Sequence, residues 1–405
     1  MFTRVTLAAV IAMTPFTHTR VVSADPADAT PHVLDGIVNA IALVGGTVVV
    51  GGSFSEVADA GRTTTYPRAN VFAFELATGR VLPGFAPVVD GPVHALAAGA
   101  GGTVYVGGDF PAVNRSRARA LARLSLADGS LVRGFTPRVG GGMVSTLARR
   151  GRHVYAGGDF TSPRTALARL DAVTGAADPR FTIEPGLPRT PKAKVYALAA
   201  SADRLVVDGS FTTLDGQPRP QLGVIDIGTP TPSVANWRTG AYEPECMADV
   251  FPSYVRGLDL SPDGSYFVVV TTGGPVSSRL RLCDSAARFE TYKTSQRVTP
   301  TWVNYTGGDS LYSVAATGAA VYVGGHQRWM DNPRGRDSAG PGAVPREGIA
   351  ALNPRTGKVL PWNPGRERGI GVKAFLAHQA GLLVGSDTTR LGREYHARIG
   401  MFPLP

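Results

Sequence analysis

The segment VYVGGDF at residues 104–110 recurs along the chain and predicts its fold. Clear copies are VVVGGSF at 48–54, VYAGGDF at 154–160 and LVVDGSF at 205–211, and weaker copies are FVVVTTGG at 267–274, VYVGGHQ at 321–327 and LLVGSD at 382–387. Successive copies lie about 50–60 residues apart. Because a regular period of this length is typical of repeat architectures, the chain reads as seven repeats of one unit.

Each repeat is predicted to contain four short strands. An alternating apolar run precedes the segment, as in VHALAA at 93–98, and a third run follows it, as in ALARLSL at 120–126. A glycine turn then leads into a fourth strand, SLVRGF at 130–135. Seven such units indicate an all-β, seven-bladed β-propeller of four-stranded antiparallel blades. The last repeat has no fourth strand of its own, so PHVLDG at 31–36 is predicted to supply it and to close the ring.

The repeated phrases also resemble a known group. VYVGGDF, ALARLSLADGSLVRGF at 120–135 and their copies resemble the delta-60 repeat family of secreted bacterial β-propellers. Residues 306–330 and 348–371 resemble the closing half of such proteins. The resemblance covers about residues 30–405 and implies the propeller fold. It implies no settled activity and no catalytic residue.

Composition narrows the class of protein. The 405 residues include 50 Gly and 31 Pro, which disfavour an all-helical fold, and 43% hydrophobic residues, which exclude global disorder. The formal charge is +10, and 36 of the 41 basic residues are Arg. This excess reflects either an Arg-biased surface or an attraction for acidic ligands. No cluster of basic and aromatic residues stands out, so no nucleic-acid partner is expected. Beyond the N-terminus no apolar run reaches the roughly 18 residues of a membrane span.

Residues 1–24 are predicted to be a signal peptide. Arg4 gives the positive start, VTLAAVIAM at 5–13 is the apolar stretch, and the small residues at 22–24 suit a cleavage site. We therefore expect a secreted, monomeric protein with a single propeller domain over residues 25–405. Export permits a disulfide between the two cysteines, Cys246 and Cys283, with two free buried thiols as the alternative.

Loop lengths predict which face carries function. Connections between second and third strands, and between blades, are long and lie on one face, where binding sites usually form. Blades five to seven concentrate Trp, Arg and His there, and His326 replaces the Asp or Ser that follows the glycines in the first four repeats. Trp stacks on sugar rings and Arg recognises carboxylates, so this face suits an acidic glycan. The predicted ligand-binding residues are His326, Arg328, Trp329, Arg334, Trp362, Arg366, Arg368 and Trp302. The alternative is a loop packed by its own Trp residues and Arg–Asp pairs.

The repeated Asp109 and Asp159 raise the question of a metal. Ser53 and Ser210 take the same place in other repeats, and Ser is a poor replacement for a carboxylate ligand. Hydrogen bonding to loop backbone explains both residue types. Neither a metal nor a cofactor is therefore expected.

Three functions remain open from the sequence. The first is a module that binds an extracellular glycan, acidic or neutral, or a protein. The second is a lyase acting on acidic glycans, which needs a cation to neutralise the uronate and a base to take its proton; the candidates are His326, Arg328, Tyr395 and His396. The third is a scaffold for protein assembly, because fold does not determine function in propellers.

Overall fold

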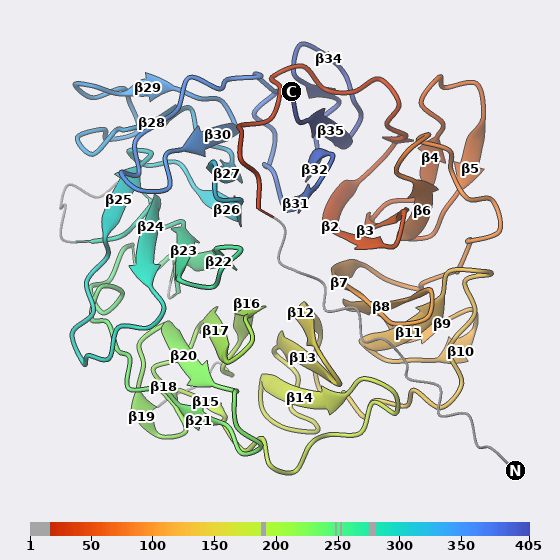
Figure 1. The fold of residues 1–405 in the computed structure, drawn as a ribbon, viewed down its shortest axis with the longest axis horizontal. Helices are drawn as coiled ribbons and strands as arrows, with labels where there is room; N and C mark the ends of the chain where they lie inside the picture. Colours follow the sequence, from red (N-terminus) through yellow and green to blue (C-terminus); the bar gives the residue numbers. More distant parts are fainter. Residues whose placement is uncertain (1–16, 188–191, 248, 252, 275–280) are drawn as a thin grey trace, which may run out of the picture.

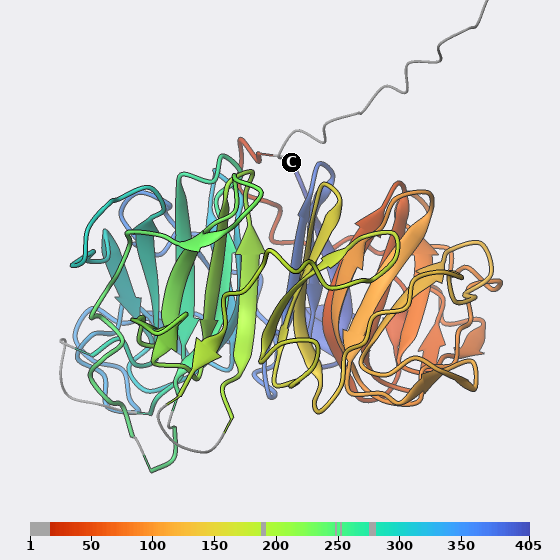
Figure 2. The same cartoon turned by 90° about the horizontal axis from the view of Figure 1, so that it is seen from below.

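The structure, a computed structural model, describes residues 17–187, 192–247, 249–251, 253–274 and 281–405. These residues form strands, turns and loops, and none of them lies in a helix. The described residues accordingly offer no helix that could cross a bilayer. Figure 1 shows the sheets arranged around a common centre, and Figure 2 shows them standing side by side when the molecule is turned.

Seven sheets of the described chain share one topology, in which the first, second and third main strands of a repeat lie antiparallel, in that order, from the centre outwards. The innermost strands are β2 (Ile37–Val44), β7 (Val93–Ala98), β12 (Val144–Arg150), β16 (Val195–Ala200), β22 (Val255–Leu260), β26 (Leu311–Ala316) and β31 (Ala374–His378). The second strands are β3 (Thr47–Ser53), β8 (Thr103–Gly108), β13 (His153–Gly158), β17 (Arg204–Gly209), β23 (Tyr266–Thr271), β27 (Val321–Gly325) and β32 (Gly381–Gly385). The third strands are β6 (Val71–Glu75), β11 (Leu121–Ser125), β14 (Leu167–Asp171), β20 (Leu222–Asp226), β24 (Ser285–Glu290), β30 (Ile349–Leu352) and β35 (Ile399–Pro403).

The predicted fourth strand is much reduced. Only the fourth and fifth sheets have one, β21 (Ser233–Val234) and β25 (Trp302–Tyr305), among the residues described. In the first, second, third and sixth sheets it shrinks to a single bridge, such as Phe74 with Val81. Proline follows closely in the first and sixth repeats, at Pro83 and Pro361. Because proline has no N–H to donate, the pairing cannot be extended there.

A small hairpin interrupts most connections between second and third strands. These hairpins are β4 (Glu56–Ala58) with β5 (Thr65–Pro67), β9 (Ala112–Val113) with β10 (Ser116–Arg117), β18 (Thr213–Leu214) with β19 (Gln217–Pro218), β28 (Trp329–Met330) with β29 (Val344–Pro345), and β33 (Arg390–Leu391) with β34 (Glu394–Tyr395). Two further short strands extend them, β1 (His32–Val33) on β4 and β15 (Pro185–Gly186) on β18. Residues 326–347, one of the long connections on the predicted face, therefore contain a version of the repeated hairpin.

The repeated glycines allow neighbouring sheets to approach. A Cβ added to Gly107 would lie 2.7 Å from Cγ1 of Val144, at the start of the next innermost strand. The same relation joins Gly51 to Val93 and Gly157 to Val195. In the first three repeats, the first glycine therefore provides the space that the next sheet's valine fills.

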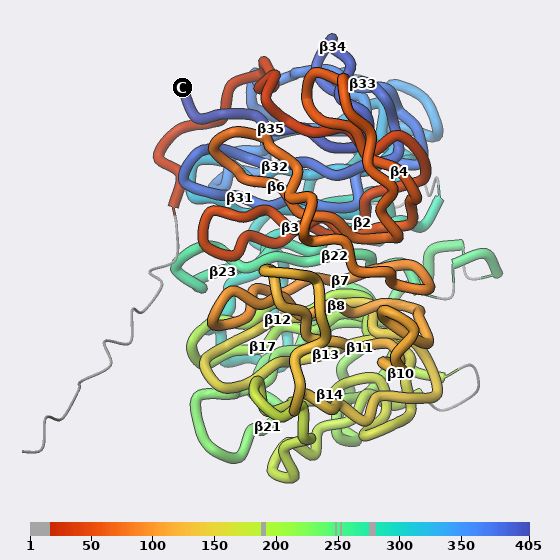
Figure 3. The backbone as a smooth tube through the Cα atoms, turned by 90° about the vertical axis from the view of Figure 1, so that its right-hand side faces the viewer, coloured from red at the N-terminus to blue at the C-terminus, as the bar shows by residue number. Residues whose placement is uncertain are grey.

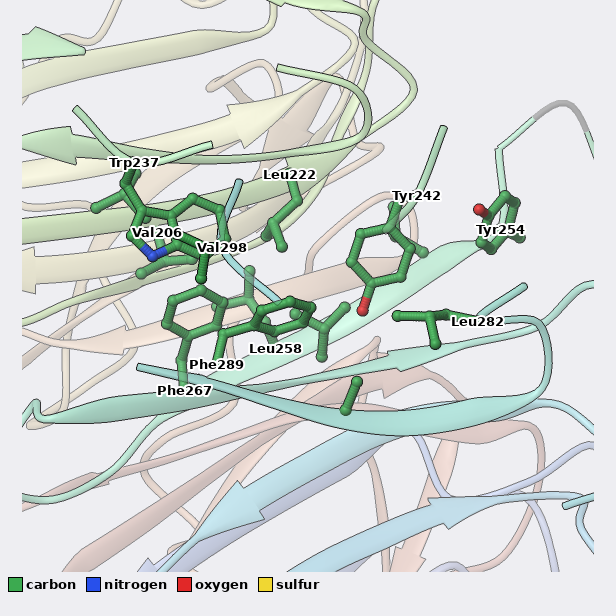
Figure 4. Packing of buried hydrophobic residues seen from close by; sticks show 14 of the residues in the cluster. Val206, Leu222, Trp237, Tyr242, Tyr254, Leu258, Phe267, Leu282, Phe289 and Val298 are labelled. Carbon is green, nitrogen blue, oxygen red and sulfur yellow. The ribbon is translucent and has the colours of Figure 1, made fainter. Parts of the chain in front are cut away.

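Apolar cores lie between the sheets. Between the fourth and fifth sheets, Trp237 packs on Phe267 and Phe289 with ring centroids 5.5 and 5.8 Å away (Figure 4). The indole N–H of Trp237 donates to the carbonyl of Glu290 at 3.0 Å, so its polar atom is satisfied inside the core.

The N-terminal segment meets the last sheet in a different way from that predicted. Residues 31–36 do not pair along β35, because His32 and Val33 pair instead with Ala58 and Val57 of β4. The segment that lies along β35 comes earlier, where the N–H groups of Ser23 and Ala27 donate to Pro403 and Met401. Figures 1 and 3 show this red segment beside the blue C-terminal strands.

The repeat comparison explains the difference in the placement of residues 31–36. Asp35-Gly36 matches Asp90-Gly91, the pair that precedes the innermost strand of the second sheet. A Cβ on Gly36 or on Gly91 would clash with a carbonyl oxygen, that of Ser53 or Asp109. PHVLDG is therefore the connection that leads into a first strand and not a fourth strand.

The fifth repeat corrects one strand and confirms the disulfide. The apolar pattern SRLRLCD at 278–284 predicts its third strand there, but the observed strand is β24, which starts at Ser285; residues 278–280 lie outside the described residues. Cys283 thus lies just before the strand and bonds to Cys246, with the two Cα atoms 5.9 Å apart. The predicted pairing is confirmed.

Candidate functional site

A cavity of about 240 Å³ lies at the centre of the molecule, lined by all seven innermost segments. In six of these strands the register shifts by one residue near the start, which is the geometry of a β-bulge. The extra residue of each bulge, together with Lys373 just before β31, faces the cavity. This central ring consists of Asn39, His94, Ser145, Tyr196, Arg256, Tyr312 and Lys373.

Cations and aromatic rings dominate one side of the central ring. Lys373 Nζ lies 3.3 Å from the ring centroid of Tyr312, and the Arg256 guanidinium carbon lies 5.3 Å from that of Tyr196. Lys194, next to the cavity, lies 5.5 Å from the same Tyr196 ring. Each ammonium or guanidinium group is thus held against the negative face of a tyrosine.

Burial changes the titration of these cations. It lowers the pKa of Lys373 to about 8, an effect that Asp387 opposes and Arg256 reinforces. Burial also lowers the pKa of Lys194 and of Arg256. Among the described residues neither Arg256 nor Lys373 forms an ion pair, and Arg256 donates only to the carbonyls of Ser253 and Val255, at 2.9 and 2.7 Å. The cavity therefore contains positive charge without a bonded countercharge.

A second set of side chains lies at or just after the end of each second strand. These residues are Ser53, Asp109, Asp159, Ser210, Thr272, His326 and Asp387. Several of them bind backbone as expected, since Asp159 accepts from the Met143 N–H at 2.8 Å and Asp387 from that of Gly371 at 3.0 Å. Asp159 also lies 4.0 Å from Lys194 Nζ. Against the larger effect of burial, which lowers the pKa of His94 and of Lys194, Asp109 and Asp159 raise it, so acidic groups lie near the basic residues of this region.

Three of the predicted site residues come together around a carboxylate that the sequence analysis did not single out. Asp309 is buried and accepts from Arg328 Nε at 2.9 Å and from Arg368 Nη2 at 2.7 Å. His326 joins them, because Arg368 Nε donates to its carbonyl and its Nδ1 lies 3.2 Å from the Tyr312 hydroxyl. Burial lowers the pKa of His326, so the imidazole is neutral near pH 7. The cluster positions Tyr312 at the edge of the cavity.

The other residues predicted for this site have different places. The guanidinium carbon of Arg328 lies 4.4 Å from the ring centroid of Trp329. Arg334 is exposed. Trp302 and Trp362 are buried in cores, where their indole N–H groups donate to the carbonyls of Pro354 and Ser23. The prediction that Trp302 and Trp362 bind a ligand is therefore not supported, because packing within and between sheets uses their apolar rings.

Arg366 is also a structural residue. Its guanidinium is buried and donates to the carbonyls of Gly325 and Arg368 and to the Thr388 hydroxyl. Tyr395 and His396 lie on or just after β34, beside His32, with ring centroids 5.1 and 6.0 Å from that imidazole. They do not line the central cavity.

The sequence contained a signal for the residues that were missed. In each repeat one polar residue directly follows the valine or leucine at the start of the first strand, as in VHALAA, VYALAA and VKAFLA. This residue interrupts the apolar pattern at one position, and its identity differs in almost every repeat. Such a position marks a bulge side chain that points away from both cores.

No protein-family model matches this chain, and no curated protein matches it. Solved structures do. The WD40 β-propeller domain of Doa1 is 12% identical, with a TM-score of 0.51 over 92% of this chain and 94% of that one. The chain has the β-propeller fold. The β-propeller domain of Cps50 (Swd1) from Myceliophteria thermophila agrees, at 12% identity and a TM-score of 0.51 over 92% of this propeller and 98% of that chain. At such identities the likeness concerns the fold alone.

Proposed function

We propose that this propeller binds a small anionic ligand, an acidic sugar unit of an extracellular glycan, in its central cavity. The observation that carries the proposal is that Arg256 and Lys373 face the same cavity with no ion-pair partner among the described residues. An arginine fork and an ammonium group together suit a carboxylate. The tyrosines hold these cations in place, so little side-chain freedom is lost on binding.

The size of the cavity restricts the ligand. About 240 Å³ is below the roughly 300–1,000 Å³ of pockets that enclose drug-sized molecules. One sugar unit, or the end of a chain, therefore fits better than a long segment of polysaccharide. Around it, Asn39, Ser145 and Tyr196 offer hydrogen bonds to hydroxyl groups. The proposal keeps the predicted face and ligand class but moves the binding residues from the outer loops to the axis.

Calorimetry with glucuronate, galacturonate and neutral glucose tests the proposal. The uronates should bind and glucose should not, and Lys373→Met and Arg256→Met should each weaken uronate binding by about 1–3 kcal/mol. Lys293→Met, at an exposed lysine away from the cavity, is the matched control and should bind normally. Equal binding of glucose and uronate, or full binding by Arg256→Met, would contradict a carboxylate site.

A lyase acting on the same ligand class is the second candidate. Arg256 could neutralise a uronate, and Lys373, whose pKa is about 8, could take a proton as its neutral amine. Incubation with polyuronates, followed by ultraviolet absorbance of the unsaturated product, separates the two functions. Product formation that Lys373→Met abolishes favours the enzyme, whereas binding without product favours the binding module.

We also infer that the seven sheets are the blades of one closed seven-bladed propeller. In support, a Cβ on Gly385 of the last sheet would approach Val38 of the first, as in the other sheet pairs. Residues 23–27 along β35 would complete the last blade. A chain that starts at residue 28 should expose β35 and self-associate. Gel filtration in which this shortened chain and the full chain are equally monomeric would contradict the closure.

Export remains part of the proposal. It is supported by the apolar N-terminal stretch and by the disulfide, which is typical of oxidising compartments. Residues 1–16 lie outside the described residues, but Val22 is buried and its N–H donates to the Tyr322 hydroxyl at 3.0 Å. Cleavage before Asp25 would remove this contact and the bond from the Ser23 N–H to Pro403, and would keep the bond from the Ala27 N–H to Met401. Mass spectrometry of the exported chain tests both points; a protein retained in the cytoplasm would contradict export.

A further inference from the structure

An arginine recurs at one place in the repeats. In the first, fourth and sixth sheets it lies two residues before the positive-φ residue that opens the third strand: Arg68 before Asn70, Arg219 before Gln221 and Arg346 before Gly348. All three arginines are at least nine-tenths buried, although none has a carboxylate partner in the described chain. The buried guanidinium groups therefore need hydrogen-bond acceptors other than carboxylates.

Backbone carbonyls provide those acceptors in the same pattern. Arg346 donates from Nη1 to the carbonyl of Pro345 at 2.7 Å and from Nη2 to that of Leu360 at 2.8 Å. Arg219 does the same to Pro218 and Ala235, both at 2.8 Å. Arg68 reaches Pro67 at 2.7 Å and Pro83 at 3.3 Å. Each of these three sheets thus has a slot that fits a guanidinium group. The slot lies between the sheet's small hairpin and the segment that follows its third strand.

The second sheet has the slot without the arginine. The corresponding residue is Ala118, two positions before the positive-φ Ala120. A cavity of about 550 Å³ lies there, lined by Ala118, Val132, Arg133 and Phe135 among others. Val132 and Arg133 correspond to Leu82 and Pro83, whose carbonyls accept from Arg68 in the first sheet. The residues that line the slot are therefore present in the second sheet, but the arginine side chain that occupies it in the other three sheets is absent.

The rim of this slot is strongly basic. Arg117, Arg119, Arg133 and Arg138 line the cavity, and all four are exposed. None of their side chains forms a salt bridge or hydrogen bond within the described residues. No acidic residue lines the cavity. A ligand whose side chain occupies the slot must therefore carry negatively charged groups next to that side chain, to pair with the four arginines.

We propose that this slot in the second sheet docks an arginine side chain carried by an acidic peptide segment. The guanidinium would occupy the place that Arg68, Arg219 and Arg346 fill in their own sheets. Carboxylates next to it in the peptide would pair with the four rim arginines, bidentate where the geometry allows. A free guanidinium ion would bind poorly, since the rim repels it, and a purely acidic peptide would leave the slot empty. The site is independent of the central cavity.

The test uses the full chain and a fluorescein-labelled peptide, Glu-Glu-Arg-Glu-Glu, with fluorescence anisotropy as the readout. A second peptide replaces the arginine by citrulline, which has nearly the same shape but no charge. The arginine peptide should bind at least tenfold more tightly than the citrulline peptide. Arg133→Glu combined with Arg138→Glu should weaken its binding by at least tenfold, and added salt should weaken it further.

Ala118→Arg restores the repeat's own side chain and is the decisive variant. It should fill the slot, raise the unfolding temperature and abolish binding of the arginine peptide. Ala100→Arg adds the same charge at an exposed position outside the cavity and should leave binding unchanged. Equal binding of the two peptides, or full binding by Ala118→Arg, would overturn the proposal. If Ala118→Arg fails to fold, the citrulline comparison on the unaltered chain still decides it.

Discussion

Gly385 packs directly against Val38, so that a Cβ added to the glycine would be 2.5 Å from Cγ1 of the valine. The two residues are more than three hundred positions apart in the chain, and they join the last sheet to the first. The same pairing of a second-strand glycine with the next sheet's valine occurs at Gly107 with Val144 and at Gly324 with Val372. The contact repeated around the centre is therefore also the contact that brings the two ends of the chain together.

Gly385→Ala should destabilise the protein by about 1–3 kcal/mol, because the added methyl group must displace Val38 or the backbone. Denaturant unfolding measures the change. Gly46→Ala is the matched control, since its Cβ would meet nothing within 4 Å and Gly46 does not have a positive φ. Equal stability of the two variants would mean that the sheets relax freely at this contact.

Ligand affinity should depend on pH through Lys373. Its pKa in the free protein is about 8, so the ammonium group that attracts an anion loses its proton as the pH rises through this value. Uronate affinity should therefore fall between about pH 7 and about pH 9. Lys373→Arg, which keeps its charge over this range, should remove most of the dependence. Calorimetry at several pH values checks it, and an unchanged pH profile in Lys373→Arg would contradict this role.

Asp208 should make the fold less stable in alkali. This fully buried carboxylate replaces the first glycine of its repeat and accepts from the Ala197 N–H at 2.8 Å. Burial raises its pKa to about 8, above the value of 3.8 for an unhindered Asp, so the native state holds the proton that the unfolded chain has lost. Its stabilising contribution is complete below about pH 4 and declines as the pH rises towards 8.

Asp208→Asn keeps the acceptor and cannot ionise. It should be more stable than the natural chain by about 1–3 kcal/mol near pH 9 and similar to it near pH 4. Asp128→Asn, at an exposed turn, is the control and should not change the difference between the two pH values. Thermal unfolding in both buffers measures the effect; parallel curves for Asp208→Asn and the natural chain would contradict it.

Loss of the disulfide should lower the free energy of unfolding. Cys246 and Cys283 are 37 residues apart, which corresponds to roughly 3–4 kcal/mol in the chain-entropy account. Replacing both cysteines by Ala should therefore lower the denaturation midpoint while leaving uronate binding intact, since neither residue lines the central cavity. A double variant as stable as the oxidised protein would show that the disulfide contributes nothing to stability beyond the packing around it.

The sequence was informative where interactions are local and repeated. Alternation of apolar residues placed the innermost strands close to their observed bounds, and cysteine count together with export predicted the Cys246–Cys283 bond. Local patterns could not show that Trp302 and Trp362 fill cores, because a tryptophan near a loop looks the same whether its ring points in or out. They also could not place residues 31–36, since the pairing with β4 depends on contacts between distant segments.

The central ring was missed for a different reason. A bulge adds one residue to a strand and so breaks the two-residue alternation on which strand prediction depends. Arg256, for example, looks like an irregularity in VRGLDL, although it is the residue that faces the cavity. Comparison of the seven repeats with one another, position by position, would have identified it.

The bulges separate the residues that pack between sheets from the residues that line the central cavity. In six innermost strands the flanking apolar residues contact neighbouring sheets, whereas the inserted residue lines the central cavity, as Lys373 does just before the seventh strand. A mutation at one of these seven positions changes the chemistry of the cavity and leaves the packing between sheets largely as it was. The chain therefore has seven copies of a position that can be changed independently, from Asn39 through Arg256 to Lys373, with little expected loss of stability.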